Sequence, residues 1–580
     1  MPRGVRRKRV KNGIIATQIA DLADFKVIFA FLRPDFLAMN CKNVSKTVSQ
    51  MRHLLTRVTN PVLRGFNPDP SICFADGTYY IATSTFEWFP GVQIHASRDL
   101  RSWRLAARPL AEKRLLDMRG VPDSCGVWAP CLSFADGLFW LCYTNVRRFD
   151  GNFKDTPNFL ITAPSIDGPW SYPVPMNASG FDPSLFHDDD GRKWFLNMVW
   201  DHRQGHDRFG GIVMQEYDPA ARRLIGRPQT IFTGSGCGGT EGPHLYKRDG
   251  WYYLLVAEGG TGYGHAATVA RSRHIAGPYE VDPAGFMLTA RGAPNHPLQR
   301  VGHASIVETP DGELYAAFLC SRRGQSPMGR ETGLQALAYT ADGWFRTSHG
   351  SPRPQETVFE GGEAPAETHV RYDFSHGLPE DFQWLRTPEP ERLFSLSARP
   401  GHLRLYGRDS IGSPFEQALV ARRQTEAAYS VEVTVDFTPD TFQQMAGLVT
   451  YYNAQKFHYL YISHDDPLGR FADVMTCAAD PSLAVQFPAW DKRLALSDGP
   501  VRLRVEVDGR WQQFYVAGAD GAWQKVGPEL DAGILSDDAG RDVDASFTGN
   551  FVGMCAQDLT GQGAPADFSD FDYRERPLAG

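Results

Sequence analysis

Five residues suited to catalysis or sugar binding occur at matching places along the chain, each seven or eight residues before an Asp-Gly pair. They are Asp69, Trp128, Asp182, Glu241 and His303. Paired carboxyl groups support general acid and base catalysis, because one can hold a proton while the other accepts one. Three in one pocket repel one another, so the pKa of at least one must rise. Hydrolysis of glycosidic bonds uses such a set.

Each of these residues also has an ordinary structural explanation. An Asp beside a Pro, as at Asp69 and Asp182, is common in turns. Trp128 alone fits a buried core, and His303 alone fits a hydrogen-bonded structural residue or part of a metal-ion site. The structural explanation fails for the three acids together, because they occupy equivalent positions in different repeats.

The elements that must position these residues form a fivefold repeat. Asp-Gly turns followed by aromatic-rich strand sequence begin at Asp76, Asp136, Asp190, Asp249 and Asp311, with spacings of 60, 54, 59 and 62 residues. Asp-Gly between apolar runs predicts a hairpin with a type I′ turn, which needs positive φ at both central residues. About 60 residues accommodate a four-stranded propeller blade. The alternative, a β-sandwich with coincidental turns, is disfavoured by the even spacing.

The repeats therefore predict a five-bladed β-propeller catalytic domain over residues 58–345, with the five candidate residues near its axis. Residues 346–368 are rich in Pro, Gly and polar groups, which predicts a linker. Beyond it, alternating apolar and polar residues predict half-buried antiparallel strands at 429–437, 446–453, 457–463 and 501–507. We predict an all-β fold, in which a lectin-like (concanavalin-like) β-sandwich occupies residues 369–580.

Charge is distributed unevenly along the 580 residues, whose formal net charge is -7. Residues 1–57 hold twelve Lys and Arg against three Asp and Glu, so the rest carries a balance of -16. An acidic body does not suit a nucleic-acid-binding protein and does suit a neutral substrate such as a sugar. We interpret residues 1–57 as a disordered extension or a mis-assigned start. A basic arm that touches nucleic acid or membrane is the alternative.

Apolar runs and cysteines limit the remaining classes. The sequence contains no apolar run of 18 residues, so we expect no transmembrane helix and no membrane partner. Nine scattered cysteines, without CxxC or zinc-finger spacing, indicate reduced thiols and a cytoplasmic protein.

Seven segments together resemble glycoside hydrolase family 43, in particular its two-domain β-xylosidases. The similarity runs from about residue 60 to residue 575. The segments are Asn60–Ser71, Ala82–Gly91, Thr162–Trp170, Gly239–His244, Gly329–Thr332, Phe547–Met554 and Gln557–Leu559.

The resemblance implies a role for each matching residue. Asp69 matches the general base, Glu241 the general acid, and Asp182 the acid that orients Glu241 and raises its pKa. The family inverts the anomeric configuration, which implies an acid and base about 6.5–9.5 Å apart. Residues implied to bind the sugar are Phe86, Trp128, Lys154, His303, Arg330 and, from the second domain, Phe547, with Phe551 as the other candidate.

The implied activity is exo-acting 1,4-β-xylosidase, which releases xylose from the non-reducing ends of xylooligosaccharides. An α-L-arabinofuranosidase acting on arabinose-substituted oligosaccharides, and a non-catalytic carbohydrate-binding propeller, remain the alternatives. No cofactor is required. Some members of the family carry a divalent cation such as Ca²⁺, which here would lie near His303, and the group often assembles into homodimers or homotetramers. This chain departs from its relatives in the loop 322–328, which is shorter and is expected to border the substrate entrance.

Overall fold

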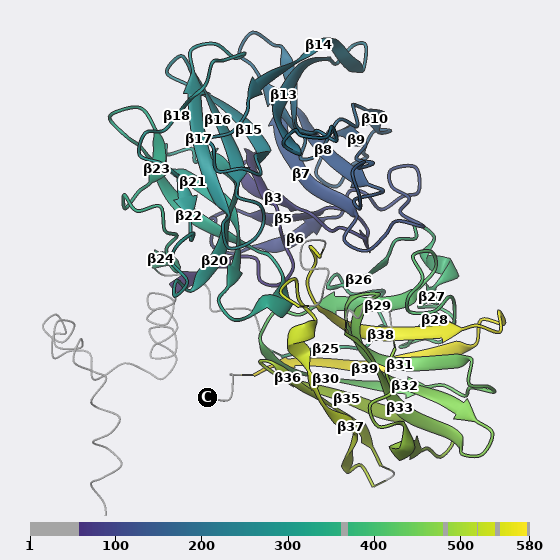
Figure 1. Cartoon of the computed structure of the whole chain (residues 1–580). Helices are drawn as coiled ribbons and strands as arrows, with labels where there is room; N and C mark the ends of the chain where they lie inside the picture. The colour runs from purple at the N-terminus through teal and green to yellow at the C-terminus, as the bar shows by residue number, and fades with distance from the viewer. Residues whose placement is uncertain (1–56, 361–368, 479–484, 519, 540–545, 577–580) are drawn as a thin grey trace, which may run out of the picture. The chain divides into compact units, whose positions relative to one another are not determined.

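A computed structural model describes residues 57–360, 369–478, 485–518, 520–539 and 546–576 of the chain (Figure 1). The predicted N-terminal extension lies outside the described residues, except for Arg57. The described residues are almost entirely strands and loops, and none of their helices is long and apolar enough to cross a membrane. Short 3-10 helices occur at η4 (Ser326–Met328), η5 (Pro390–Arg392), η6 (Trp490–Lys492) and η7 (Ala532–Ile534).

The first part of the chain forms five antiparallel sheets in sequence order, which confirms the predicted five-bladed propeller. Blade 1 consists of β2 (Ser71–Ala75), β3 (Thr78–Thr83), β5 (Gln93–Ser97) and β6 (Arg104–Ala107). Blade 2 consists of β7 (Gly126–Ala135), β8 (Leu138–Val146), β9 (Asn158–Ala163) and β10 (Val174–Pro175). Blade 3 consists of β11 (Ser184–His187), β12 (Lys193–Trp200), β13 (Phe209–Asp218) and β14 (Arg223–Phe232).

Blades 4 and 5 follow the same order. They consist of β15 (Glu241–Arg248), β16 (Trp251–Glu258), β17 (Ala266–Ser272), β18 (Glu280–Val281) and β19 (Leu288–Thr289), which pairs with β17; and β20 (Leu298–Glu308), β21 (Leu314–Arg322), β22 (Glu331–Tyr339) and β23 (Phe345–Thr347).

Side chains on the first strands of the blades join neighbouring blades. Ser71 on β2 donates from its hydroxyl to the carbonyl of Leu132 on β7 and accepts from the Leu132 amide. On the other side of β2, the Ile72 amide donates to the Ser305 hydroxyl of β20 at 2.7 Å. Blades 5 and 1 are therefore linked directly, which closes the ring.

The Asp-Gly turns are of two kinds. At Asp76, Asp136 and Asp249 both turn residues have positive φ, as the type I′ prediction requires. At Asp190 and Asp311 only the glycine has positive φ. The flanking pairs, His187 with Lys193 and Glu308 with Leu314, show that five residues connect these strands instead of two. The type I′ prediction is therefore wrong for the third and fifth repeats, where the loop is longer.

The second part of the chain forms two large antiparallel sheets, which confirms the predicted concanavalin-like sandwich. The first sheet contains β25 (His369–Tyr372), β27 (Phe394–Ser395), β28 (Leu403–Tyr406), β30 (Ala428–Asp436), β35 (Val501–Asp508), β36 (Trp511–Ala517), β37 (Trp523–Asp531) and β39 (Pro565–Glu575).

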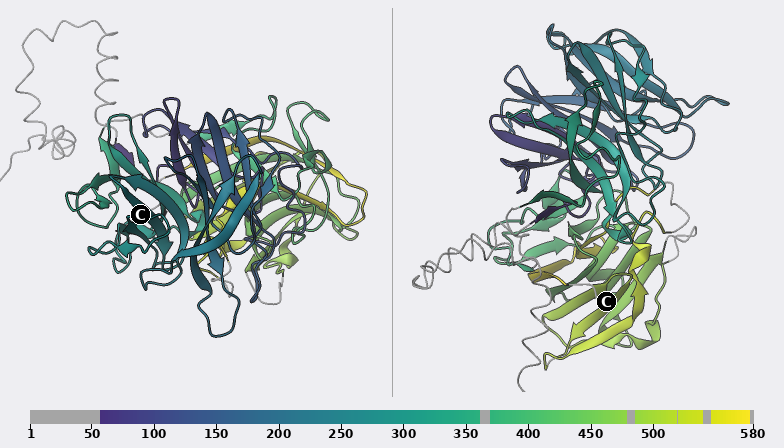
Figure 2. Two further views of the ribbon diagram at one scale, coloured as in Figure 1. Left: turned by 90° about the horizontal axis from the view of Figure 1, so that it is seen from above. Right: turned by 90° about the vertical axis from the view of Figure 1, so that its left-hand side faces the viewer.

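The second sheet reaches from the sandwich into the propeller sequence. It contains β4 (Trp88–Phe89), β26 (Phe382–Leu385), β29 (Ala418–Arg423), β31 (Gln444–Asn453), β32 (Lys456–Asp465), β33 (Gly469–Ala478), β34 (Leu494–Ala495) and β38 (Phe551–Asp558). The four strands predicted at 429–437, 446–453, 457–463 and 501–507 correspond to β30, β31, β32 and β35. Figure 2 shows the propeller and the sandwich from two further directions.

Strand β4 joins the two bodies of strands through backbone and side chains. It belongs to the sequence of blade 1 but pairs with β26, so that Trp88 lies opposite Leu385. The fully buried Trp88 ring stacks on Phe551 of β38, with 3.7 Å between centroids and 14° between planes. In addition, β1 (Arg57–Thr59) pairs with β24 (Thr357–Glu360), within the predicted linker. Backbone pairing and ring stacking at β4 therefore connect the sandwich to the sequence of blade 1.

Candidate active site

A cavity of about 610 Å³ lies where the propeller meets the sandwich, and it contains most of the residues predicted for the site. The predicted carboxylates Asp69, Asp182 and Glu241, which line it together with Asp537 and Asp538, are buried, with 5–7% of each of the three residues exposed. The predicted residues in its lining are Asp69, Asp182, Glu241, Phe86, Trp128, His303, Arg330 and Phe547.

The backbone at the carboxylates turns their side chains away from the ordinary strand pleat. Asp69 and Asp182 have φ values of 56° and 57°, and each lies two residues before the first strand of its blade. At Glu241 the register of β15 against β16 shifts before His244, and the intervening Gly242 has a φ of 57°. Bulges and left-handed residues re-aim side chains beside active sites, at a cost that the surrounding structure must offset.

Two donors hold the Asp69 carboxylate in place. Its Oδ2 accepts from the Ser84 hydroxyl at 2.7 Å, and its Oδ1 accepts from Nη1 of Arg330 at 2.9 Å. Nδ1 of His303 lies 3.9 Å from the same Oδ1. Burial lowers the pKa of His303, which favours the neutral ring. Asp69 is therefore an oriented hydrogen-bond acceptor beside a neutral imidazole.

The other two carboxyl groups are shifted toward their protonated forms. Burial, and then the negative charge of Asp69, raise the pKa of Glu241 to about 8. Burial, Glu241 and Asp69 together raise the pKa of Asp182 well above its usual range. Asp182 also accepts through Oδ2 from the Gly242 amide, next to Glu241, at 3.1 Å. At neutral pH the site therefore favours a proton on Glu241, as a general acid requires.

Aromatic rings and one guanidinium form the walls. Trp128 contacts Phe86 and Phe547, with ring centroids 5.6 and 5.7 Å apart. Arg330 lies over the Phe86 ring, 5.2 Å from its centroid, and donates through Nη2 to the Phe547 carbonyl at 2.8 Å. Residues from blades 1, 2 and 5 and from the sandwich thus meet at one wall.

Two predicted candidates lie away from the cavity surface. Lys154 is not among the described lining residues; its Nζ donates to the Phe149 carbonyl at 2.6 Å and lies 4.1 Å from the Trp200 ring centroid. It supports two rings that do line the cavity. Phe551 is fully buried against Trp88, so Phe547 is the sandwich phenylalanine that reaches the cavity.

The residues of the short loop 322–328 do not line the cavity itself, but Arg322–Gly324 and Ser326 line an adjacent hollow together with the cavity residues Tyr263, Arg300 and Asp538. The loop also packs against the sandwich, where the Pro327 carbonyl accepts from the Asn550 amide at 2.7 Å. The loop joins the two domains next to the cavity, and its place at the substrate entrance stays a prediction.

Several lining residues were not predicted from the sequence. Phe181 directly precedes Asp182 and could have been found from that position. The others come from propeller strands, from loops and from the sandwich, at positions that the repeat did not single out. They are Trp200, Phe209 and Arg300 on strands, and Phe149, Gly259–Tyr263, Asp537, Asp538 and Ser546 elsewhere.

The surroundings of His303 bear on the expected Ca²⁺. Its ring packs on Gly242, where a β-carbon would lie 3.0 Å away, and the buried His265 lies against the neighbouring Gly302. Ca²⁺ prefers six to eight oxygen ligands. Asp69 is the carboxylate beside this ring, and it already accepts from Arg330. No group of three or more His, Cys, Asp or Glu residues suited to a metal occurs among the described residues. The side chains present do not form an oxygen cage.

Asp69, Asp182 and Glu241 in one aromatic-walled pocket of a five-bladed propeller are the carboxyl groups that a glycoside hydrolase needs. The chain belongs to glycosyl hydrolases family 43, whose sequence profile matches residues 58–345. Residues 371–574 match the beta xylosidase C-terminal concanavalin A-like domain.

Known proteins of similar length resemble the chain across both domains. Xylosidase/arabinosidase 43B of Humicola insolens is 51% identical over 90% of this chain and 98% of its own. The beta-xylosidase of Bacillus subtilis strain 168 is 47% identical over 90% and 100%. The crystal structure of xylan beta-1,4-xylosidase from Bacillus halodurans C-125 superposes with a TM-score of 0.86, at 46% identity over 90% and 100%.

Proposed function

We propose that this protein is an inverting, exo-acting 1,4-β-xylosidase that releases xylose from the non-reducing ends of xylooligosaccharides. The observation that carries the proposal is the convergence of Asp69, Asp182 and Glu241, in three unlike environments, in one cavity. The names of the relatives from Bacillus support the xylose specificity.

Glu241 is the general acid in this mechanism. Its pKa of about 8 keeps it protonated at neutral pH, and it donates that proton to the glycosidic oxygen as the bond to the anomeric carbon breaks. Asp182 bonds to the amide of Gly242 and so holds the backbone beside the acid. It acts by orienting Glu241.

Asp69 is the general base. The bonds from Ser84 and Arg330 fix its carboxylate, which accepts a proton from water as that water attacks the anomeric carbon from the opposite face. Attack from that face inverts the configuration, so the first product from a β-xyloside is α-xylose. After the products leave, Asp69 gives up its proton and Glu241 takes one up, so each cycle consumes one water and no net proton.

The residues that form the walls of the cavity recognise the sugar. Arg330 presents a planar fork of donors to hydroxyl groups, while Phe86, Trp128 and Phe547 supply ring faces and exclude water. His303 offers a neutral ring nitrogen next to Asp69. Because the sandwich contributes Phe547 at the cavity, the sugar binds in a pocket between two domains, which favours removal of single end residues.

Arabinofuranoside cleavage is the second candidate activity, since the relative from Humicola insolens is named for both sugars. The deciding experiment compares kcat/KM for p-nitrophenyl β-D-xylopyranoside and α-L-arabinofuranoside, with proton NMR of the first anomer released. Faster xyloside cleavage with α-xylose as the first product supports the proposal. Faster arabinoside cleavage identifies the α-L-arabinofuranoside as the main substrate. β-Xylose as first product refutes inversion, and cleavage of neither glycoside with xylose still bound favours a carbohydrate-binding propeller.

Metal requirement, assembly and cellular location complete the proposal. Since all acid and base groups are side chains, we expect EDTA to leave the rate of xyloside hydrolysis within about twofold, and a larger loss restored by Ca²⁺ would contradict this. We propose a cytoplasmic protein, because the nine cysteines are scattered along the sequence without CxxC or zinc-finger spacing. Assembly into a homodimer or homotetramer is testable by light scattering.

A further inference from the structure

Phe547 is fixed to the propeller through its own backbone. Its amide donates to the Ser124 hydroxyl at 3.1 Å, and its carbonyl accepts from Nη2 of Arg330 at 2.8 Å. Its ring lies edge-on to Trp128 and Phe149, with centroids 5.7 and 5.0 Å apart. A sandwich residue is thus inserted into a wall that the propeller otherwise builds.

The residues on either side of Phe547 are held by the sandwich. The Ser546 hydroxyl accepts from Nζ of Lys456 at 3.0 Å. The Thr548 amide donates to the Tyr452 hydroxyl at 3.0 Å, and the Thr548 hydroxyl donates to the Tyr452 carbonyl at 3.2 Å. Tyr452 lies on β31 and is fully buried.

The Tyr452 hydroxyl also connects this segment back to the propeller. It donates to Oδ1 of Asp537 at 2.5 Å, and Oδ2 of Asp537 accepts from Nη1 of Arg300 at 2.7 Å. The Arg300 and Asp537 side chains are only 5% and 9% exposed. Arg300 belongs to β20 of blade 5, three residues before His303. A buried ion pair therefore sets the position of the hydroxyl that accepts from Thr548.

We propose that Tyr452 is a positioning residue that fixes Phe547 in the sugar pocket. The inference rests on the proposed function, because it assigns a role in binding the substrate of that same site. Tyr452 is not among the described residues that line the cavity. Its hydroxyl bonds the lining residue Asp537, and through Thr548 it holds Phe547, which is the contact that we infer matters for the sugar. A displaced ring weakens binding of substrate and transition state alike, which raises KM while kcat changes little.

The test is Tyr452→Phe, which keeps the ring and removes only the hydroxyl. We expect KM for the glycoside that the wild type hydrolyses to rise about five- to twentyfold, as for the loss of one buried hydrogen bond, with kcat within about threefold. The dissociation constant of D-xylose, measured by tryptophan fluorescence, should rise by a similar factor.

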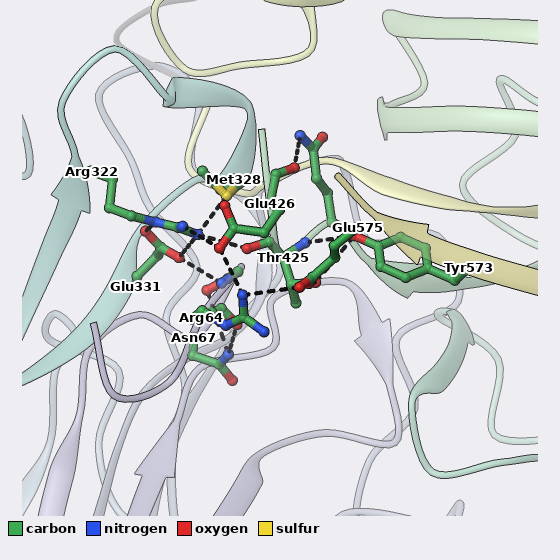
Figure 3. A network of polar contacts seen from close by, with 11 residues as sticks. Arg64, Asn67, Arg322, Met328, Glu331, Thr425, Glu426, Tyr573 and Glu575 are labelled. Atoms are coloured by element: carbon green, nitrogen blue, oxygen red, sulfur yellow. Dashed lines mark hydrogen bonds and ion pairs between the residues drawn. The ribbon is translucent and has the colours of Figure 1, made fainter. Parts of the chain in front are cut away.

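Arg64→Met is the matched control. It breaks a different contact between the domains, since Nη1 of Arg64 bonds Glu426 at 2.7 Å and Glu575 at 3.2 Å (Figure 3). We expect a lower thermal midpoint with unchanged KM. If Tyr452→Phe also lowers the midpoint but leaves both KM and xylose affinity unchanged, Tyr452 is only structural and the proposal is wrong.

A double-mutant cycle with Phe547→Ala separates positioning from a general loosening of the pocket. In the Phe547→Ala background, Tyr452→Phe should change xylose affinity by less than about twofold, because its effect passes through the missing ring. Full additivity would overturn the proposal. If the wild type hydrolyses neither glycoside, the proposed function is refuted but the role of Tyr452 is not. The xylose affinities of the variants then still test whether Tyr452 positions Phe547.

Discussion

Arg330 directly precedes Glu331, the first residue of β22, and the two side chains belong to different networks. Arg330 bonds Asp69 in the cavity, whereas the fully buried Glu331 bonds Nε and Nη2 of Arg322, both at 2.9 Å, and accepts from the Gly65 amide at 2.7 Å. Figure 3 shows this second network, in which Arg322 also reaches Glu426 of the sandwich at 2.7 Å. The residue that holds the proposed base is therefore anchored by its neighbour to the domain interface.

Arg322→Met should destabilise the fold by about 3–5 kcal/mol, because it leaves the buried Glu331 charge without its main partner. The urea midpoint of unfolding measures this. Arg57→Met is the control, since Arg57 and Glu360 form an ion pair with side chains 65% and 73% exposed, and its loss should cost less than about 1 kcal/mol. Equal effects for the two variants would contradict the importance given to burial.

Glu241→Ala should lower kcat/KM for xylobiose by about 10²–10⁴, as expected for loss of a general acid. The loss should be much smaller for 2,4-dinitrophenyl β-xyloside, whose leaving group departs without a proton. Steady-state kinetics on both substrates measure the difference. A similar loss on both would mean that Glu241 does something other than protonate the leaving group.

The pH dependence of kcat/KM for xylobiose should show an alkaline limb near pH 8. The pKa of Glu241 is raised to about 8, so the acid is protonated below that pH and loses its proton above it. Activity should therefore fall about tenfold per pH unit above 8. An alkaline limb near pH 5, the range of an ordinary Glu, would show that the cavity does not shift this group.

Glu241→Gln should stabilise the protein more at pH 8 than at pH 5. A raised pKa means that the folded state binds the proton more tightly than the unfolded chain, so the wild type loses stability as pH rises from about 4.5 to about 8. Glutamine carries no such proton, and the difference should grow to a few kcal/mol at pH 8. Thermal unfolding of both proteins across this range measures it, and a pH-independent difference would contradict the burial of a proton at Glu241.

The repeated Asp-Gly pairs were enough to predict the propeller, because a turn that needs positive φ restricts the residues that can form it. The same period placed Asp69, Asp182 and Glu241 at equivalent positions, and the structure brings all three into one cavity. Strand alternation likewise located β30, β31, β32 and β35. These features depend on local conformation and on hydrophobic periodicity, both of which the sequence records directly.

Contacts between distant segments were decided by the tertiary structure. Nothing local in the sequence indicates that Trp88 pairs with the sandwich, that Lys154 lies behind Phe149, or that Arg300 bonds Asp537. The choice of Phe547 over Phe551 has the same origin, since two phenylalanines four residues apart are equivalent in composition. Only the packing of β38 against Trp88 buries one ring and leaves the other at the cavity. Sequence periodicity thus determined which chemical groups converge, and burial between the two domains decided their protonation and the shape of the pocket.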